Sequence, residues 1–332
     1  MRRRSVRLAI VALLGLLVGV AASLTYLRLT APAPRPAPGW ELLAEMPGPR
    51  GETAVAVADG LVYVAGGFTG IDFATTGAVS IYEAASDRWH DGPPLPEPRN
   101  HAAAAAHAGV VYVSGGTAPD GAASDLAWSL AAGGQWERID PMPGPRSGHR
   151  MVALGDRLYV IGGVGGPAAG AGATGRVLIF DGTWTEGAAM PVNRDHLAVV
   201  VVGEEIWAIG GRAAGVNHRR VDIYDPAADA WHSGPPLPEA TSGAAEAVLD
   251  GVIYISGGED PATGSIVDRH WRLDTSLGDA ASWEPLAPPP LAVHGVQGAA
   301  IDGRFLVIAG STRAGGQSNT GWTGATQAFR PR

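Results

Sequence analysis

The sequence predicts an all-β fold assembled from six copies of one strand-rich unit. Three observations predict it: a recurring glycine pair, a tryptophan with the same spacing, and many glycines and prolines between short Val/Ile/Tyr runs. The glycine pairs begin at Gly66, Gly115, Gly162, Gly210 and Gly257, with Ala309-Gly310 as a degenerate sixth. The tryptophans are Trp40, Trp89, Trp136, Trp184, Trp231 and Trp283. Both series advance by 49, 47, 48, 47 and 52 residues, so they mark one repeat.

Composition excludes several other classes of protein. The 332 residues include 48 glycines and 26 prolines, about 22% of the chain, yet 46% are hydrophobic, which is enough to fill a core. The glycines keep no three-residue period, which excludes collagen. The absence of cysteine excludes disulfide frameworks, thiol nucleophiles, zinc–thiolate sites and iron–sulfur clusters. The net charge is −8, and because five arginines lie in the first thirty residues, the remainder carries −13, which disfavours nucleic acid as a partner.

The first 29 residues form an export signal or an anchor. Four arginines, at positions 2, 3, 4 and 7, precede an uncharged run from Leu8 to Leu27. Such a run is long enough to span a bilayer, and Val20-Ala21-Ala22 resembles a cleavage site, so residues 1–29 are expected to be either a signal peptide or a single transmembrane anchor. Both alternatives place the remainder in the periplasm or outside the cell, tethered to the cytoplasmic membrane if the segment is not cleaved. Residues 30–38 read as a Pro-rich linker, and 39–332 contain the repeats.

Each unit is expected to contain four strands. In the first copy, the small residues of Thr53–Val57 suit a crowded innermost strand, and Leu61–Ala65, apolar on both faces, suits a buried second strand. The glycine pair ends that strand, where the backbone approaches a neighbour or takes a positive φ. Tyr82-Glu83 marks a third strand, and Trp89 opens the outer one. An arginine lies sixteen residues before the glycine pair in four copies, and we expect it to donate hydrogen bonds to loop carbonyls. These arginines are Arg50, Arg99, Arg146 and Arg194, and the last two copies have Thr241 and Val293 at the same position.

At these residues the chain resembles the kelch-repeat family, from about Gly39 to Arg332. The resemblance implies a six-bladed β-propeller in which each unit forms one blade and ligands meet loops at one mouth of the central channel. Trp40 begins an outer strand with no inner strands before it, and the last copy ends on a third strand at Phe329. We therefore expect Trp40–Met46 to complete the last blade and close the ring.

The same resemblance places the residues just after the arginine position at the channel mouth. Among them we predict ligand-binding roles for Glu52, Asn100, His101, His149, Asp195, His196 and His294. The alternative is that the histidines only bond loop backbone. Three histidines on a ring could in principle bind a metal, but they come from different units without a fixed close spacing, so no metal site and no cofactor is predicted.

A second strip follows the glycine pairs, where the units differ: Phe68, Thr117, Val164, Arg212, Glu259 and Ser311. The loop from Arg212 to Arg220 is locally positive, and Arg212 is predicted to hold a carboxylate or phosphate. The glycine-rich loop from Gly310 to Trp322 carries Arg313, also a ligand-binding candidate, and either covers the channel or is disordered.

Two functions remain open. The first is a binding propeller for an unknown protein or an acidic carbohydrate, which needs no catalytic group. The second is a sugar-active enzyme, since exported kelch propellers include a sialic acid mutarotase; His196 or Glu259 would then exchange the proton and Arg212 would clamp the carboxylate. A copper-radical oxidase of the galactose oxidase type is excluded, because its cysteine–tyrosine crosslink needs a cysteine.

Overall fold

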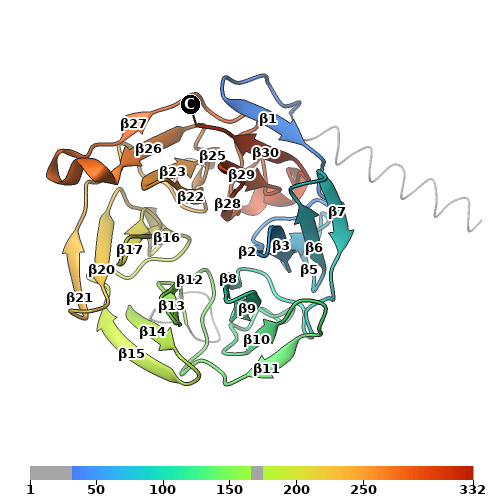
Figure 1. Ribbon diagram of the computed structural model, residues 1–332. Coiled ribbons are helices and arrows are strands. Elements are labelled where there is room, and N and C mark those ends of the chain that lie inside the picture. Colours follow the sequence, from blue (N-terminus) through green and yellow to red (C-terminus); the bar gives the residue numbers. More distant parts are fainter. Residues whose placement is uncertain (1–31, 166–174, 332) are drawn as a thin grey trace, which may run out of the picture.

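A computed structural model of the chain describes residues 32–165 and 175–331. Figure 1 shows six radial sheets around a central axis, which confirms the expected all-β, six-bladed propeller. The segment expected to be a signal peptide or an anchor, 1–29, lies outside the described residues. Within the described ranges no helix is long and apolar enough to cross a membrane.

Each blade is a four-stranded antiparallel sheet. From the axis outward, blades 1 to 3 are β2 (Ala54–Ala58), β3 (Leu61–Ala65), β6 (Val79–Glu83) and β7 (Arg88–Asp91); β8 (Ala103–His107), β9 (Val110–Ser114), β10 (Ala127–Leu130) and β11 (Glu137–Ile139); and β12 (Arg150–Leu154), β13 (Arg157–Ile161), β14 (Arg176–Phe180) and β15 (Trp184–Ala189). Blades 4 to 6 are β16 (Ala198–Val202), β17 (Glu205–Ile209), β20 (Val221–Asp225) and β21 (Ala230–Ser233); β22 (Ala245–Leu249), β23 (Val252–Ser256), β26 (His270–Asp274) and β27 (Glu284–Pro285); and β28 (Gly298–Ile301), β29 (Arg304–Ile308), β30 (Thr326–Phe329) and β1 (Trp40–Leu43).

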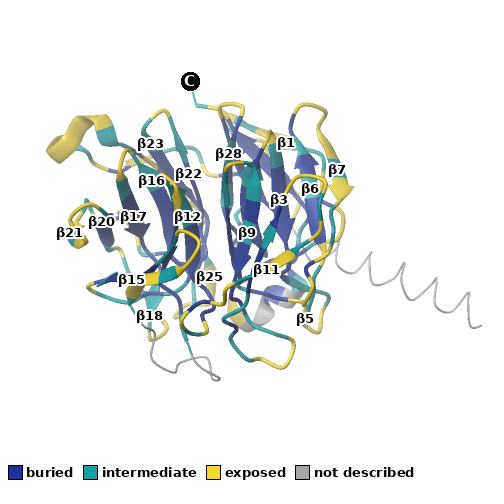
Figure 2. Ribbon diagram, turned by 60° about the horizontal axis from the view of Figure 1, so that its bottom comes forward, coloured by how far each residue is buried: buried dark blue, intermediate teal, exposed yellow. Residues whose placement is uncertain are grey.

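Short hairpins and 3₁₀ helices lie in the connections between the blade strands. Three two-stranded hairpins follow second strands: β4 (Phe68–Thr69) with β5 (Ala74–Thr75), β18 (Arg212–Ala213) with β19 (Val216–Asn217), and β24 (Glu259–Asp260) with β25 (Ser265–Ile266). Figure 2 shows that β5, β18 and β25 lie at the same end of the ring. Two 3₁₀ helices, η1 (Thr275–Ala280) and η2 (Gly315–Thr320), lie in longer connections.

The glycine pairs are required by close backbone contacts between blades. Gly66 and Gly67 both have positive φ, and a Cβ on Gly66 would lie 2.3 Å from the carbonyl oxygen of Arg99 in the next blade. No side chain fits there. The pair therefore fixes how closely one blade packs on the next, which explains its recurrence.

The repeated tryptophans join neighbouring blades at the outer rim. Each indole N–H donates to a carbonyl in the preceding blade of the ring, as from Trp89 to Ala44 at 2.8 Å and from Trp231 to Ala188 at 3.2 Å. The other four bonds run from Trp40 to Ala287, Trp136 to Pro93, Trp184 to Asp140 and Trp283 to Pro235. Because Trp40 lies on β1, the six bonds return to their starting blade. We name this set the rim circuit.

The strand nearest the N-terminus belongs to the last blade. β1 pairs antiparallel with β30, with Trp40 opposite Phe329 and Leu43 opposite Thr326. Trp40 also contacts the rings of Phe305 and His270. Residues nearly three hundred positions apart are thus in one sheet.

The repeat arginines are structural, as predicted. Arg50, Arg146 and Arg194 are buried and each donates to the carbonyl of the first glycine of its own pair, sixteen residues later. Thr241 makes the same contact with its hydroxyl, to Gly257 at 3.1 Å. The position satisfies a buried carbonyl in each of these four blades.

Candidate functional site

The innermost loops are joined by a ring of backbone hydrogen bonds. The residue two positions after each arginine position has a positive φ, and its N–H donates to the carbonyl of the same residue in a neighbouring blade, at 2.6–3.0 Å. The six residues are Glu52, His101, Gly148, His196, Gly243 and Gly295. We name this ring the inner circuit. Glycine tolerates this conformation, whereas Glu52, His101 and His196 hold it at a cost of order 1 kcal/mol each.

The two strips singled out in the sequence meet at this end of the ring. The residue after each arginine position forms an antiparallel bridge with the residue after the glycine pair. The bridges pair Gly51 with Phe68, Asn100 with Thr117, Ser147 with Val164, Asp195 with Arg212, Ser242 with Glu259, and His294 with Ser311.

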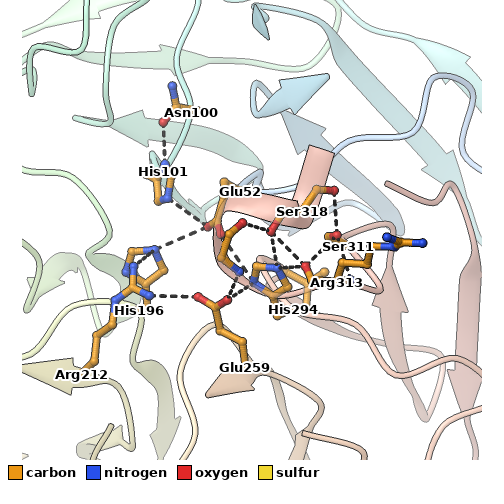
Figure 3. A network of polar contacts seen from close by, with 12 residues as sticks. Glu52, Asn100, His101, His196, Arg212, Glu259, His294, Ser311, Arg313 and Ser318 are labelled. Atoms are coloured by element: carbon orange, nitrogen blue, oxygen red, sulfur yellow. Dashed lines mark hydrogen bonds and ion pairs between the residues drawn. The ribbon is translucent and has the colours of Figure 1, made fainter. Parts of the chain in front are cut away.

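These bridges assemble a polar network at the centre, which Figure 3 shows from close by. We name it the central cluster: Glu52, Asn100, His101, Asp195, His196, Arg212, Glu259 and His294. Glu52 lies in the middle, with His101 Nε2 at 3.4 Å, His196 Nε2 at 3.8 Å and His294 Nδ1 at 3.9 Å from its carboxylate oxygens. Eight of the residues proposed from sequence thus come together from five blades.

Arg212 is held by groups of the cluster itself. Its Nε donates to Asp195 Oδ1 at 2.9 Å, its Nη1 to Glu259 Oε1 at 2.9 Å, and its Nη2 lies 3.0 Å from His196 Nε2. Arg220 pairs with the buried Asp222, and Arg219 donates to the carbonyl of Leu237. The expected anion-binding loop is therefore not an open positive patch, since its carboxylate partners come from its own and the next blade.

The loop after the last glycine position lies over the cluster. The N–H of Gly315 in η2 donates to Glu259 Oε2 at 2.8 Å, and Ser318 Oγ lies 2.9 Å from His294 Nε2. Trp322 packs against Gly51 and donates to the carbonyl of Gly70. Of the two expectations for this loop, covering the channel is the one that the structure shows. Arg313 contributes its carbonyl, which His294 Nε2 contacts at 2.8 Å, whereas its side chain is exposed.

Burial and charge set the ionisation of the cluster. Burial alone would raise the pKa of Glu52, but the surrounding imidazoles and Arg212 lower it to about 2. Burial lowers the pKa of His101 to about 4. For Asp195 the opposing effect of His196 and Arg212 outweighs burial and lowers the pKa. At neutral pH these carboxylates are charged and His101 is neutral.

His149 lies away from the cluster. It stands three positions after its arginine, whereas His101 and His196 stand two after theirs, and it is fully buried with Nε2 3.1 Å from Ser114 Oγ. The sequence predicts a ligand-binding role for His149, as it does for the other histidines within three residues of the arginine position. Because successive residues of an extended segment point to opposite sides, this shift of one residue directs the His149 side chain into the contact between two blades.

The next layer of the channel holds polar residues that the sequence reading missed. Arg150 pairs with Glu246 at 3.0 Å and donates to the carbonyl of Val296, and Gln297 accepts the N–H of Val55. Burial raises the pKa of Glu246 to about 7, although Arg150 opposes it. These side chains line a cavity of about 370 Å³ between the inner strands. The sequence does contain a signal for these residues: Arg150 and Glu246 are charged, whereas the inner strands otherwise consist mainly of small and apolar residues.

Comparison with known proteins agrees with the architecture. The Kelch motif matches residues 145–191 and 193–238, which are the third and fourth blades. Similar proteins include Kelch repeat and BTB domain-containing protein 12 of Danio rerio, 31% identical over 47% of this chain and 28% of its own length, and Kelch-like protein 34 of Homo sapiens, 36% identical over 38% and 21%. Kelch-like protein terF of Aspergillus terreus is 32% identical over 34% and 27%. The matches thus span under a third of each relative. The sixfold repeat, the six four-stranded blades and the matched motif support assignment of the chain to the kelch-repeat β-propeller family.

Proposed function

We propose that this protein is an exported binding module that holds a protein partner on the end of the ring bearing the central cluster. The observation that carries the proposal is the shape of this end. Three hairpins lie at this end of the ring, and two of them expose large apolar side chains, at Ile71, 60% exposed, and Val216, 63% exposed. Exposed apolar side chains on loops that differ between blades suit a surface that holds a protein partner.

The scaffold suits such a role. The rim circuit and the inner circuit fix each blade to its neighbours, so loops that differ between blades are presented on a rigid frame. We also propose that the pairing of β1 with β30 keeps the ring closed in solution.

An acidic carbohydrate is a weaker candidate ligand at this end. Arg212 already contacts two carboxylates, so an acidic sugar would have to displace Asp195 or Glu259. The mutarotase alternative meets the same difficulty. Both nitrogens of His196 have partners inside the cluster, and the carboxylate oxygens of Glu259 accept from Arg212 and from the N–H of Gly315 in η2.

Site-specific photo-crosslinking in the producing cells tests the binding proposal. A photoreactive residue at Val216 is compared with one at Leu277, which is 54% exposed but lies in η1, at the opposite end of β26 from the hairpin β24–β25. We expect a discrete adduct from position 216 and none from 277. Equal labelling at both positions, or none at 216 and 71, would contradict the proposal.

Export is tested separately. We expect protease added to intact spheroplasts to digest the propeller, and the N-terminus of the mature protein to be either Ser23 or the original start. Protection from the protease would contradict export and would leave the binding surface untouched.

A further inference from the structure

His294 presents a nitrogen for which the described residues supply no hydrogen-bond partner. Its Nε2 lies 2.8 Å from the carbonyl oxygen of Arg313, which can only accept, so the ring proton is on Nε2. Its Nδ1 is therefore a lone pair when the ring is neutral. That nitrogen is buried in a side chain only 4% exposed, and it faces Glu259 Oε2 at 3.5 Å and Glu52 Oε1 at 3.9 Å. A lone pair facing two carboxylates lacks the positive charge that would make the contact favourable.

His101 is oriented in the same way. Asn100 donates through Nδ2 to Thr75 and to the carbonyl of Thr117, which fixes its Oδ1 as the atom facing His101 Nδ1. The imidazole proton is therefore on Nδ1. Its Nε2 lone pair faces Glu52 Oε2 at 3.4 Å.

His196 completes the pattern. Its Nδ1 donates to the Asp195 carboxylate, and its Nε2 lies 3.8 Å from Glu52 Oε2 and 3.0 Å from Arg212 Nη2. All three imidazoles thus bond an acceptor on one side and direct the other nitrogen toward Glu52. This is the arrangement of histidines that bind metals, in which the second ring nitrogen donates to a carbonyl, amide or carboxylate.

The charged groups of the cluster are consistent with a bound cation. Three carboxylates, Glu52, Asp195 and Glu259, lie around one guanidinium, Arg212. A divalent cation beside Glu52 would offset negative charge in a largely buried place, where uncompensated charge is costly.

We propose that Glu52, His101 and His196 bind one divalent first-row transition-metal ion, with His294 as a further donor beside Glu52. The ligand atoms of the first three lie within 4.8 Å of one another. An ion among them would take the place of the contact between Arg212 Nη2 and His196 Nε2, and Arg212 would keep its two carboxylates. Imidazole and carboxylate donors suit Zn²⁺, Ni²⁺, Cu²⁺ or Fe²⁺ rather than Mg²⁺ or Ca²⁺.

The ion site does not depend on the protein partner proposed above. Its ligands lie beneath the projecting hairpins, and crosslinking from Val216 can be measured after treatment with a chelator. Failure of one proposal is therefore distinguishable from failure of the other.

The test uses the full-length protein without a polyhistidine tag, dialysed against EDTA and then titrated with Zn²⁺. We expect the wild type to retain a single Zn²⁺ per chain by mass spectrometry of the metal, and to melt at a higher temperature with Zn²⁺ than without it. Glu52→Gln and His101→Gln should each weaken Zn²⁺ binding by at least about 10-fold. The matched control is His232→Gln, which removes a histidine that also pairs with a glutamate, Glu205, but on the surface; it should bind as the wild type does.

Two further measurements keep the outcome decisive. Melting without metal shows whether each variant is folded, and His294→Gln, which alters a donor at the edge of the site, replaces any variant that is not. Visible absorption of Co²⁺ bound to the wild type should show ligand-field bands that Glu52→Gln lacks. The proposal is overturned if the wild type retains no Zn²⁺, or if Glu52→Gln retains as much as His232→Gln.

Discussion

Replacing Arg194 by methionine should destabilise the propeller more than any change in the surface loops. Arg194 is fully buried and donates to Asp222 Oδ2 at 2.7 Å and to the carbonyls of Gly210 at 2.6 Å and Ala208 at 3.1 Å. Methionine keeps most of the volume and removes every one of these bonds.

The loss of stability expected for Arg194→Met depends on how well the buried Asp222 carboxylate is still paired. Breaking a buried ion pair costs about 3–5 kcal/mol because a charge stays buried without its partner. Asp222 keeps the partly exposed Arg220, at 2.8 Å, so we expect the lower limit, about 3 kcal/mol. For a chain of this size that corresponds to a decrease in Tm of about 6 °C.

Thr241 offers a matched control in the next blade. It occupies the same position and makes one neutral hydrogen bond, so Thr241→Val should cost about 1 kcal/mol. Urea unfolding followed by tryptophan fluorescence, with thermal melting by circular dichroism, measures both. The double variant Arg194→Met/Asp222→Asn should recover part of the loss. If Arg194→Met is no less stable than Thr241→Val, the assignment of the arginine to the scaffold is wrong.

Two other predictions concern the closure of the ring by β1 and the loss of stability at low pH. Deleting residues 40–46 removes β1 and the partly buried Trp40, and should lower Tm by at least about 6 °C for the whole ring in a single transition; an unchanged melting curve would refute closure by β1. Burial, with Arg146 and Arg150, lowers the pKa of His149 to about 3, and burial lowers that of His270 to about 4. The unfolded chain therefore binds more protons, so stability is lost as pH falls from about 6.5 to 4, and His149→Gln/His270→Gln should flatten that slope in urea unfolding at stepped pH.

The repeat made the fold predictable because each marker has a local physical cause. The glycine pair ends a strand where a carbonyl of the next blade leaves no room for Cβ, and the tryptophan donates one repeat back. Such causes recur in every unit, so they are visible as periodicity in a single sequence.

The site could be predicted only in part, because its chemistry arises between units. The strip after the arginines and the strip after the glycine pairs contain the cluster residues, but the sequence does not show that Asp195 and Glu259 hold Arg212. Neither does it show that three histidines with unrelated spacing face Glu52. His149 stands one residue further from its arginine than His101 and His196 do, and its side chain lies beside Ser114 instead of in the cluster.

The inner circuit allows the side chains of the site to change while the scaffold stays the same. Its six bonds use only main-chain atoms, so any residue that tolerates a positive φ preserves them. Three positions carry side chains and three carry glycine, and at Gly295 a Cβ would lie 2.6 Å from Glu52 Oε1, in space that Glu52 occupies. The glycine of the sixth blade thus leaves room for the Glu52 side chain of the first blade. New functional groups can be exchanged around the axis one blade at a time, at the modest cost of a left-handed residue, without reopening the ring.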